Sequence, residues 1–381
     1  MQLTQAKLLQ YTLQQSFLRV IIPNIKKGLH MKIGIIGLEQ AGKTTVFNAL
    51  TGANKEVGSF GKIEANISMV SVPDSRIDWL SKLYNPKKTV YTNIEFVDIL
   101  GNINDSSDAK IVAAAREVDA FVFVIRAFTN PNVLHPLGEN NPLRDFESIK
   151  TGLIIADMSI AEKRIEKLEK MVSKGAGTPE DKLEFSSLQK IMKILGSENL
   201  ASSTDLNTQE EKTVRSFQFL TLKPFLTVFN TSEGNFRSED TLALIKKLPN
   251  SMAMCANIEM EIRRLDENDR KEFLEDLGIQ ELSLNPFIRN AYKTLGLISF
   301  FTVGDDEVRA WTIQKETPAV TAAGKIHSDL ERGFIRAEVF SFDDIKEKGS
   351  EREVKNSGLF RLEGKDYLVK DGDIISIKFS V

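Results

Sequence analysis

The chain has 381 residues, of which 41% are hydrophobic and 27% charged, a composition typical of a soluble protein with two or three domains. Its formal net charge is −3, and no apolar stretch approaches the roughly 18 residues of a membrane span, which argues against a globally basic nucleic-acid-binding protein and a membrane protein. The single cysteine, Cys255, excludes an internal disulfide framework and indicates a reducing compartment.

The start of the chain is basic. Residues 1–30 contain lysine and arginine but no acidic residue. Such a start, with serine and glutamine, is one signature of a transit peptide. Arg19 interrupts the apolar stretch, however, and no small-residue cleavage site follows it. We therefore expect residues 1–30 to be an extension or the product of a misplaced start, and the folded chain to begin at Met31.

A complete phosphate-binding loop motif, G-x-x-x-x-G-K-[ST], occupies residues 37–44. The apolar run 32–36 precedes it and a helical pattern over 45–50 follows it, which is the context that the motif requires. Without that context, a simple glycine-rich turn is the alternative. Amides that open such a helix point at phosphates, Lys43 is expected to bind the β- and γ-phosphates, and the Thr44 hydroxyl is expected to bind Mg²⁺. The expected nucleotide contacts in this loop are Gln40, Ala41, Gly42, Lys43, Thr44 and Thr45.

Apolar runs alternate with helical patterns from Met31 to about Asn130. This alternation predicts an α/β domain with a mostly parallel sheet that is covered on both faces. The expected strands are 32–36, 68–72, 93–97 and 120–125, and the expected helices are 44–50, 76–83 and 109–118.

The pattern changes between residues 154 and 195, where apolar residues recur at intervals of three and four on either side of a Gly/Pro-containing segment. This spacing predicts two helices that form an antiparallel hairpin. Its apolar stripe is either a simple seam between helices or a partner-binding surface. A buried strand is expected at 225–229. After Ser299, short β-like runs at 300–303, 308–313, 336–340, 367–368 and 374–379 predict a small C-terminal α+β domain.

Two further motifs fit a Mg²⁺-nucleotide enzyme. Asp98 ends an apolar strand and is followed by Gly101, as in a metal-side carboxylate with a switch glycine that senses the γ-phosphate. The turn Asn230-Thr231-Ser232-Glu233 follows the strand at 225–229. Guanine-specific enzymes have Asn-Lys-x-Asp there, so strict guanine selection is not expected; an ordinary surface turn is the alternative. Cys255 and Ala256 stand where a second base-contacting loop is expected.

Seven further stretches are distinctive: Asn141–Glu147, Cys255–Glu259, Glu272–Gly278, Val308–Ile313, Ala322–Asp329, Gly333–Ala337 and Glu363–Tyr367. Together they resemble the Obg-like ATPase (YchF) family of P-loop proteins. The similarity runs from Met31 to Val381 and is strongest after Cys255. Asn230 and Glu233 match the family's base-reading turn, Asn-x-x-Glu.

The resemblance implies a domain order and a function. It implies a G domain over residues 31–285 with a helical insertion at about 136–215, and a C-terminal TGS domain of β-grasp type over 298–381. It implies Mg²⁺-dependent binding and hydrolysis of a nucleoside triphosphate, with ATP at least as good as GTP. We expect the hydrolysis to be slow because of the departures from the family pattern described next. It also implies a cytoplasmic protein that associates with the ribosome or ribosomal RNA through the TGS domain and the helical insertion, and not with a membrane.

The chain departs from the family pattern at three places. Lys62 replaces the switch threonine that would ligate the metal, although a lysine could touch a phosphate directly. The segment 102–107 is shorter than the family's Gly-rich loop, and Gln40-Ala41 replaces Asn-Val. These departures favour a second hypothesis, a nucleotide-dependent binding protein with little or no hydrolysis. A GTP-preferring GTPase is another alternative, whereas a P-loop kinase is disfavoured because the base-reading turn and TGS-like end have no place in one.

Two residues are candidates for catalysis, Gly101 and His135. The family uses a histidine in an Asn-x-x-His context, which residues 132–135 match, and a neutral imidazole near the γ-phosphate could orient water. An exposed loop histidine is the alternative. His327 is expected to be structural or to face a partner. A basic cluster that either contacts RNA phosphates or forms a solvated face consists of Lys325, Arg332 and Arg336.

Overall fold

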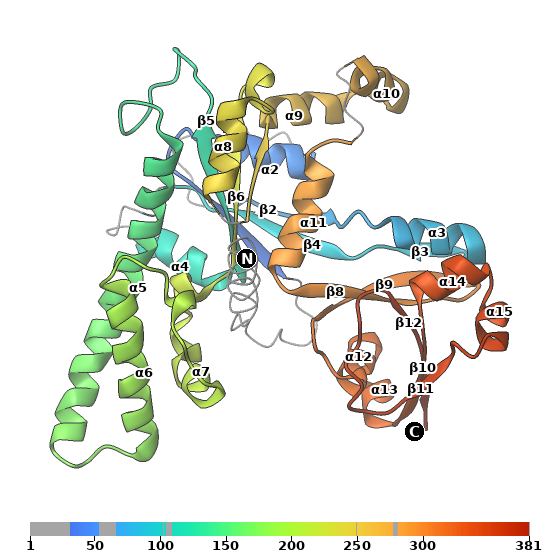
Figure 1. Cartoon of the computed structure of the whole chain (residues 1–381). Helices are drawn as coiled ribbons and strands as arrows, with labels where there is room; N and C mark the ends of the chain where they lie inside the picture. The colour runs from blue at the N-terminus through green and yellow to red at the C-terminus, as the bar shows by residue number, and fades with distance from the viewer. Residues whose placement is uncertain are drawn as a thin grey trace, which may run out of the picture. The chain divides into compact units, whose positions relative to one another are not determined.

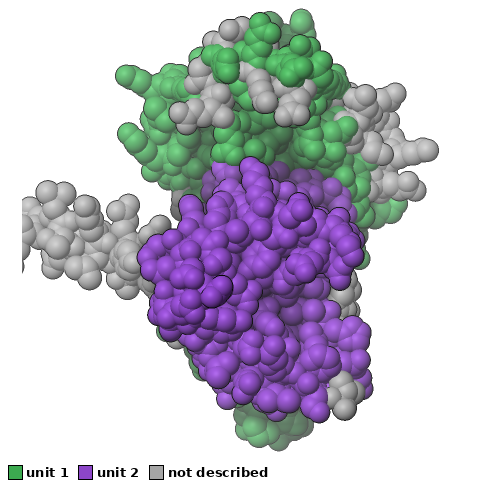
Figure 2. All heavy atoms as spheres, turned by 90° about the vertical axis from the view of Figure 1, so that its right-hand side faces the viewer, with its two compact units in different colours: residues 1–24, 31–68, 95–287 green, residues 25–30, 69–94, 288–381 purple. Residues whose placement is uncertain are grey.

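The computed structural model describes residues 31–52, 66–101, 103, 109–248, 250–276 and 281–380. The contacts divide this part of the chain into two compact units, which are coloured separately in Figure 2. The first unit holds Met31–Ser68 and Glu95–Phe287, and the second holds Met69–Ile94 and Ile288–Val381. The expected extension and Lys62 lie outside the described residues.

The sheet of the first unit follows the strand order β2-β4-β1-β5-β6-β7. Every neighbouring pair from β4 to β7 is parallel. β1 pairs with both β4 and β5 and therefore lies between them. This arrangement confirms the expected α/β fold with a mostly parallel sheet. The strands are β1 (Lys32–Ile36), β2 (Asn66–Ser71), β4 (Asn93–Asp98), β5 (Ala120–Ala127), β6 (Phe225–Thr231) and β7 (Ser251–Met254).

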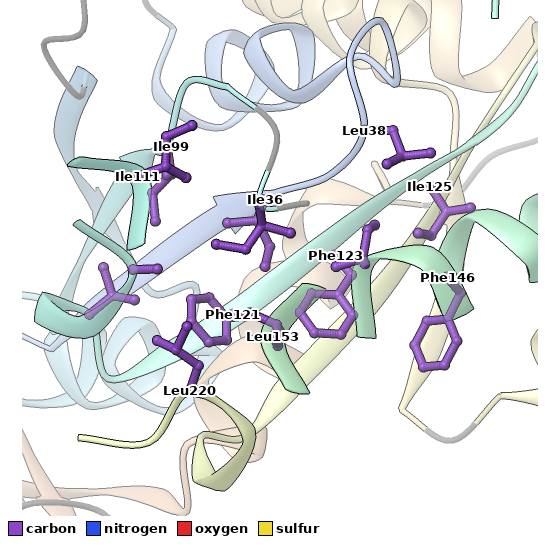
Figure 3. Close-up of a cluster of buried hydrophobic side chains, with 14 of the residues drawn as sticks. Ile36, Leu38, Ile99, Ile111, Phe121, Phe123, Ile125, Phe146, Leu153 and Leu220 are labelled. Carbon is purple, nitrogen blue, oxygen red and sulfur yellow. The ribbon is translucent and has the colours of Figure 1, made fainter. Parts of the chain in front are cut away.

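The core of this unit forms around β5, whose residues are buried on both faces as in other parallel sheets. Its alternate residues Phe121, Phe123 and Ile125 join one hydrophobic cluster with Phe146 of the following helix (Figure 3). The Phe123 ring stacks on Phe225 of β6 with 4.7 Å between centroids. Burial of each such ring stabilises the fold by roughly 1.5–3 kcal/mol relative to exposure. The core therefore fixes the strand ends where the predicted motifs lie.

The helices of the first unit follow the strands in the expected alternation. The phosphate-binding loop leads directly into α2, and the Asp-x-x-Gly motif precedes α4. Helix α11 begins in this unit and ends in the second. The bounds are α2 (Lys43–Thr51), α4 (Ala109–Glu117), α8 (Glu239–Lys247), α9 (Ala256–Arg264), α10 (Glu267–Asp276) and α11 (Leu284–Thr294).

The expected helical hairpin is present as α5 (Pro142–Ser173) and α6 (Pro179–Leu195), which lie side by side (Figure 1). The Asn141 side chain accepts a hydrogen bond from an amide in the first turn of α5, and Thr178 forms a capping box with α6. Proline in the first turn of each helix suits the position, where the amide has no intrahelical partner. The short helix α7 (Thr208–Val214) packs beside α6. None of the described helices is both long and apolar enough to cross a membrane.

The second unit is built on a sheet with the order β11-β10-β12-β8-β9-β3. This second sheet, with its short helices, agrees with the predicted C-terminal domain. One expected strand is misplaced: β11 lies at Arg361–Glu363, whereas Leu368 forms only an isolated bridge with Pro318. The elements are β3 (Lys88–Val90), β8 (Leu297–Thr302), β9 (Glu307–Gln314), β10 (Phe334–Ser341), β12 (Asp373–Phe379), α3 (Ser75–Tyr84), α12 (Ala319–Ile326), α13 (Ser328–Arg332), α14 (Phe342–Lys348) and α15 (Glu351–Asn356).

Residues 69–94 were expected inside the G domain, but the contacts group them with the C-terminal sheet. β3 pairs in parallel with β9, and the α3 residues Ile77 and Leu80 are fully buried in a cluster with Phe301 and Phe340. The apolar spacing of α3 predicts a helix correctly. It does not say which core the buried face enters, because any hydrophobic core satisfies an amphipathic helix.

Candidate nucleotide-binding site

The backbone of the phosphate-binding loop explains its glycines. Gly42 has φ of 92° and Gln40 has φ of 59°, so the chain enters the left-handed region twice before α2 begins. At Gly37, a Cβ atom would lie 2.4 Å from the carbonyl oxygen of Val124 on β5. A side chain at position 37 would therefore push the loop off the sheet. The glycines allow the tight turn that directs the first amides of α2 into the loop.

Lys43 is buried and its ammonium is held by backbone carbonyls. Its Nζ donates to the oxygens of Gly37 (2.9 Å), Leu38 (3.1 Å) and Gly101 (3.2 Å). Burial lowers the pKa of Lys43 to about 8, and the nearby carboxylates of Asp98 and Glu39 oppose that shift. The lysine thus joins the phosphate-binding loop to the switch glycine.

Thr44 and Asp98 form the polar centre beside this lysine. The Thr44 hydroxyl donates to Asp98 Oδ2 at 3.1 Å, and Asn66 Nδ2 lies 3.5 Å from the same oxygen. Asp98 is fully buried, and its Oδ1 has no hydrogen-bond partner in the structure as described. Burial raises the pKa of Asp98. A buried carboxylate oxygen without a partner, next to a hydroxyl, fits the oxygen donors that Mg²⁺ prefers.

Gly101 has φ of 107°, and a Cβ atom there would lie 2.3 Å from Ile111 Cδ1. The glycine is therefore required by both backbone conformation and space. Two of the expected departures, Lys62 and most of the segment 102–107, lie outside the described residues.

Asn230 has a different environment from the one that a direct base contact suggests. The side chain is buried; its Nδ2 donates to the carbonyl of Ala41 at 3.1 Å, and its Oδ1 accepts from the amide of Ala256 at 3.2 Å. Thr231 is also buried and donates to the carbonyl of Met254. These bonds hold the phosphate-binding loop, β6 and the start of α9 together, as a frame for the base-binding edge.

The other two residues expected near the base lie beside this frame. Glu233 is exposed at the start of the 3₁₀ turn η4 (Glu233–Asn235). Cys255 is buried directly before α9, and burial raises the pKa of its thiol. The structure therefore brings Asn230, Thr231, Cys255 and Ala256 together and leaves the Glu233 carboxylate facing solvent.

Two residues at this edge were not singled out from the sequence, Arg126 and Phe128. Arg126 is opposite Asn230 in the β5–β6 register and is 4% exposed. Its guanidinium lies 4.7 Å from the centroid of the Phe128 ring, and its Nη1 has no hydrogen-bond partner within the described chain. A Cβ atom on Gly42 would be 4.0 Å from Phe128 Cε1. A charged residue at the carboxyl end of an otherwise apolar strand is the signal that could have found this pair.

His135 is not the exposed loop residue that was the alternative to a catalytic role. Its side chain is only 4% exposed. Nδ1 accepts from the amide of Leu137 at 3.1 Å, and Nε2 lies 2.7 Å from Asp145 Oδ2. Both ring nitrogens are therefore bonded within the protein. To orient a water molecule, His135 would have to give up one of these two bonds.

The strand–loop–helix motif, the buried carboxylate on the neighbouring strand and the lysine between them define a P-loop nucleotide-binding protein of the GTPase type. A family model described as "50S ribosome-binding GTPase" matches residues 32–156. A model for the C-terminal part of YchF GTPases, described as "Protein of unknown function (DUF933)", matches residues 297–380.

Individual relatives match nearly the whole chain. The "Ribosome-binding ATPase YchF" of Pasteurella multocida is 40% identical over 362 residues, covering 92% of this chain and 99% of that protein. The protein of the same name from Bacillus subtilis is 40% identical over 366 residues, covering 91% and 99%. The solved structure of the Schizosaccharomyces pombe YchF GTPase has a TM-score of 0.80 at 31% identity, covering 93% and 99%. The chain belongs to the YchF family, and it is a P-loop nucleoside triphosphate hydrolase.

Proposed function

We propose that this protein binds a Mg²⁺-nucleoside triphosphate at the loop 37–44, with ATP at least as good as GTP, and hydrolyses it slowly. The observation that carries the proposal is the buried group formed by Lys43, Thr44 and Asp98. A triphosphate can replace the three carbonyls as the partner of the ammonium, because its oxygens carry full negative charge and bind a cation more strongly. The loop amides then hold the same phosphates.

Mg²⁺ fits the residues present. Thr44 and Asp98 would hold it, since the Asp98 Oδ1 atom is buried without a partner and needs a cation or donor to offset its desolvation. When bound, the metal would neutralise charge on the β- and γ-phosphates. The hydrogen bond to Asp98 Oδ2 fixes the position of the Thr44 hydroxyl beside the residues that would hold the metal.

The proposed preference for ATP rests on Glu233 and Asn230. Glu233 carries one more methylene than the aspartate that accepts two hydrogen bonds from guanine, and it is exposed rather than fixed in the frame. The Asn230 side chain uses both its Nδ2 and its Oδ1 in hydrogen bonds within the protein. One Nδ2 hydrogen is left to bond a base edge. Neither residue selects strongly for guanine, so the site has no strong means of rejecting adenine.

We further propose association with the ribosome in the cytoplasm, from the printed names of the relatives. In the second unit, Arg336 of β10 and Lys378 of β12 are opposite each other and exposed, although Lys378 also pairs with Glu338. Two cations on an open part of a sheet suit RNA phosphates. Arg332, expected in the same cluster, is instead bonded to Asp329. Both the C-terminal domain and the helical hairpin are candidate surfaces.

A calorimetric titration of the wild type and of Lys43→Ala with Mg²⁺-ATP and Mg²⁺-GTP tests the binding proposal. We expect the wild type to bind both, and the variant to lose most of its affinity. Unchanged ATP binding by the variant would refute the assignment of the site.

The second candidate is a nucleotide-dependent binding protein with little or no hydrolysis. Lys62 stands where the family has a metal-ligating threonine, and this departure favours the second candidate. A turnover assay on protein that binds ATP in the titration separates the two.

A further inference from the structure

The loop that carries His135 is held by polar contacts at both of its ends. Arg126 donates to the carbonyl of Val133 at 2.9 Å just before the histidine. Arg144 donates to the carbonyl of Leu137 at 3.2 Å and to that of Glu139 just after it. Such bonds from arginines to backbone carbonyls fix a loop without regular secondary structure. The imidazole therefore has a defined position.

The tautomer of His135 follows from these contacts. A backbone amide can only donate, so Nδ1, which accepts from Leu137, carries no hydrogen. In the neutral ring the hydrogen must then be on Nε2, which donates to Asp145 Oδ2 at 2.7 Å. Asp145 is itself 1% exposed, and its other oxygen accepts from Arg144 at 2.9 Å. Arg144 therefore holds one oxygen of Asp145, and the other oxygen fixes the ring.

The two bonds of the ring are not equivalent. The bond to Asp145 is short and joins two nearly buried side chains, whereas the amide of Leu137 belongs to an exposed residue and can bond to water instead. Nδ1 is therefore the nitrogen that can be released at small cost. Release leaves an acceptor on a ring that is still anchored through Nε2.

From this geometry we infer that Asp145 is a positioning residue for hydrolysis, which holds His135 in the Nε2–H tautomer so that Nδ1 can accept a hydrogen bond from the attacking water. The inference rests on the proposed hydrolytic function. In the step that it serves, the water oxygen forms a bond to the γ-phosphorus while the bond from that phosphorus to the bridging oxygen breaks. The bridging oxygen leaves with the nucleoside diphosphate, and the proton of the water goes to the phosphate product.

Asp145 lies in the first turn of α5, where the helix start holds its backbone in place. The Asn141 side chain accepts from the amide of Arg144 at 3.2 Å, which fixes the turn that presents the carboxylate. The contacts of Asp145 with His135 and Arg144 would also stabilise the loop if they had no role in hydrolysis. The test must therefore measure turnover separately from folding.

The test uses the full chain labelled with ¹⁵N-histidine. The sequence contains three histidines, and His135→Gln assigns the signal of interest. In the wild type we expect the Nε2–H tautomer with a slowly exchanging ring proton. In Asp145→Ala we expect the ring proton to exchange rapidly, so that its signal disappears. The conservative variant Asp145→Asn can still accept the bond and should keep it. Glu147→Gln, an exposed carboxylate of the same helix, is the matched control and should change nothing.

Turnover of Mg²⁺-ATP is measured on the same samples. For Asp145→Ala we expect kcat to fall about tenfold or more with KM within about twofold, and for Asp145→Asn a smaller fall. Equal kcat in the wild type and both folded variants would overturn the inference, as would an unchanged His135 signal in Asp145→Ala. If Asp145→Ala does not fold, Asp145→Ser decides, because its side chain is one atom shorter and cannot make the same bond to the ring: a kcat equal to wild type overturns the inference. A wild type with the expected signal but no turnover would refute the proposed hydrolysis, and the inference with it.

Discussion

ATP binding should weaken above pH 8, because the phosphate-binding lysine is buried. Burial lowers the pKa of Lys43 to about 8, from its usual 10.5. Bound triphosphate favours the charged ammonium, so binding above pH 8 must be accompanied by proton uptake. At a pKa of about 8, roughly nine-tenths of the lysine is protonated at pH 7 and roughly one-tenth at pH 9. The expected loss is therefore about tenfold in Kd, or about 1.4 kcal/mol, between these values.

Isothermal titration of Mg²⁺-ATP at pH 7, 8 and 9 measures this loss, and buffers of different ionisation enthalpy report the protons taken up. Lys43→Arg is the control, because a guanidinium stays charged throughout the range and should remove the pH dependence of whatever affinity remains. A wild-type Kd that is constant from pH 7 to pH 9, without proton uptake at pH 9, would show that the ammonium is not the group that meets the phosphates.

Three other substitutions test individual contacts and residues of the first unit. Gly37→Ala should lower nucleotide affinity and cost about 1–3 kcal/mol of stability, because its Cβ atom meets the carbonyl of Val124 at 2.4 Å; thermal unfolding and titration measure both. Asp157→Ala should cost about 3–5 kcal/mol in denaturant unfolding, because it removes the buried partner of Arg116 and of two backbone amides. Glu233→Asp should shift the ratio of ATP to GTP affinity toward GTP, in a competition titration.

Matched controls keep these outcomes specific. Gly364→Ala adds a methyl group where, apart from its chain neighbours, no atom of the described residues lies within 4 Å, and Glu166→Ala removes an exposed carboxylate from the same helix as Asp157. Losses as large as in the test variants would mean that the contacts named are not responsible. A Glu233→Asp variant with an unchanged ratio of affinities would remove Glu233 from the base-binding site.

The sequence predicts the parts of the fold that depend on local pattern. The run 32–36, the loop 37–44 and the helix after it are found as predicted, because the glycines and the apolar strand act on their own neighbours. The helices α5 and α6 are found for the same reason, through spacing and a proline-containing turn.

Contacts between residues distant in the sequence are what the pattern does not predict. The apolar face of α3 does not indicate from its sequence that it is buried against the C-terminal sheet. Nothing in the tripeptide around His135 indicates that Asp145, ten residues away, accepts its Nε2–H. Asn230 likewise looks like a base-reading residue, but its contacts to Ala41 and Ala256 depend on three segments meeting at one edge of the sheet.

The most direct test of the account is steady-state turnover of ATP and GTP, side by side with Mg²⁺ present, by the wild type and Lys43→Ala. We expect slow hydrolysis by the wild type, with ATP used at least as well as GTP, and loss of both activities in the variant. Turnover that survives in Lys43→Ala, or a preference of the wild type for GTP of about tenfold or more, which is about 1.4 kcal/mol, would contradict it.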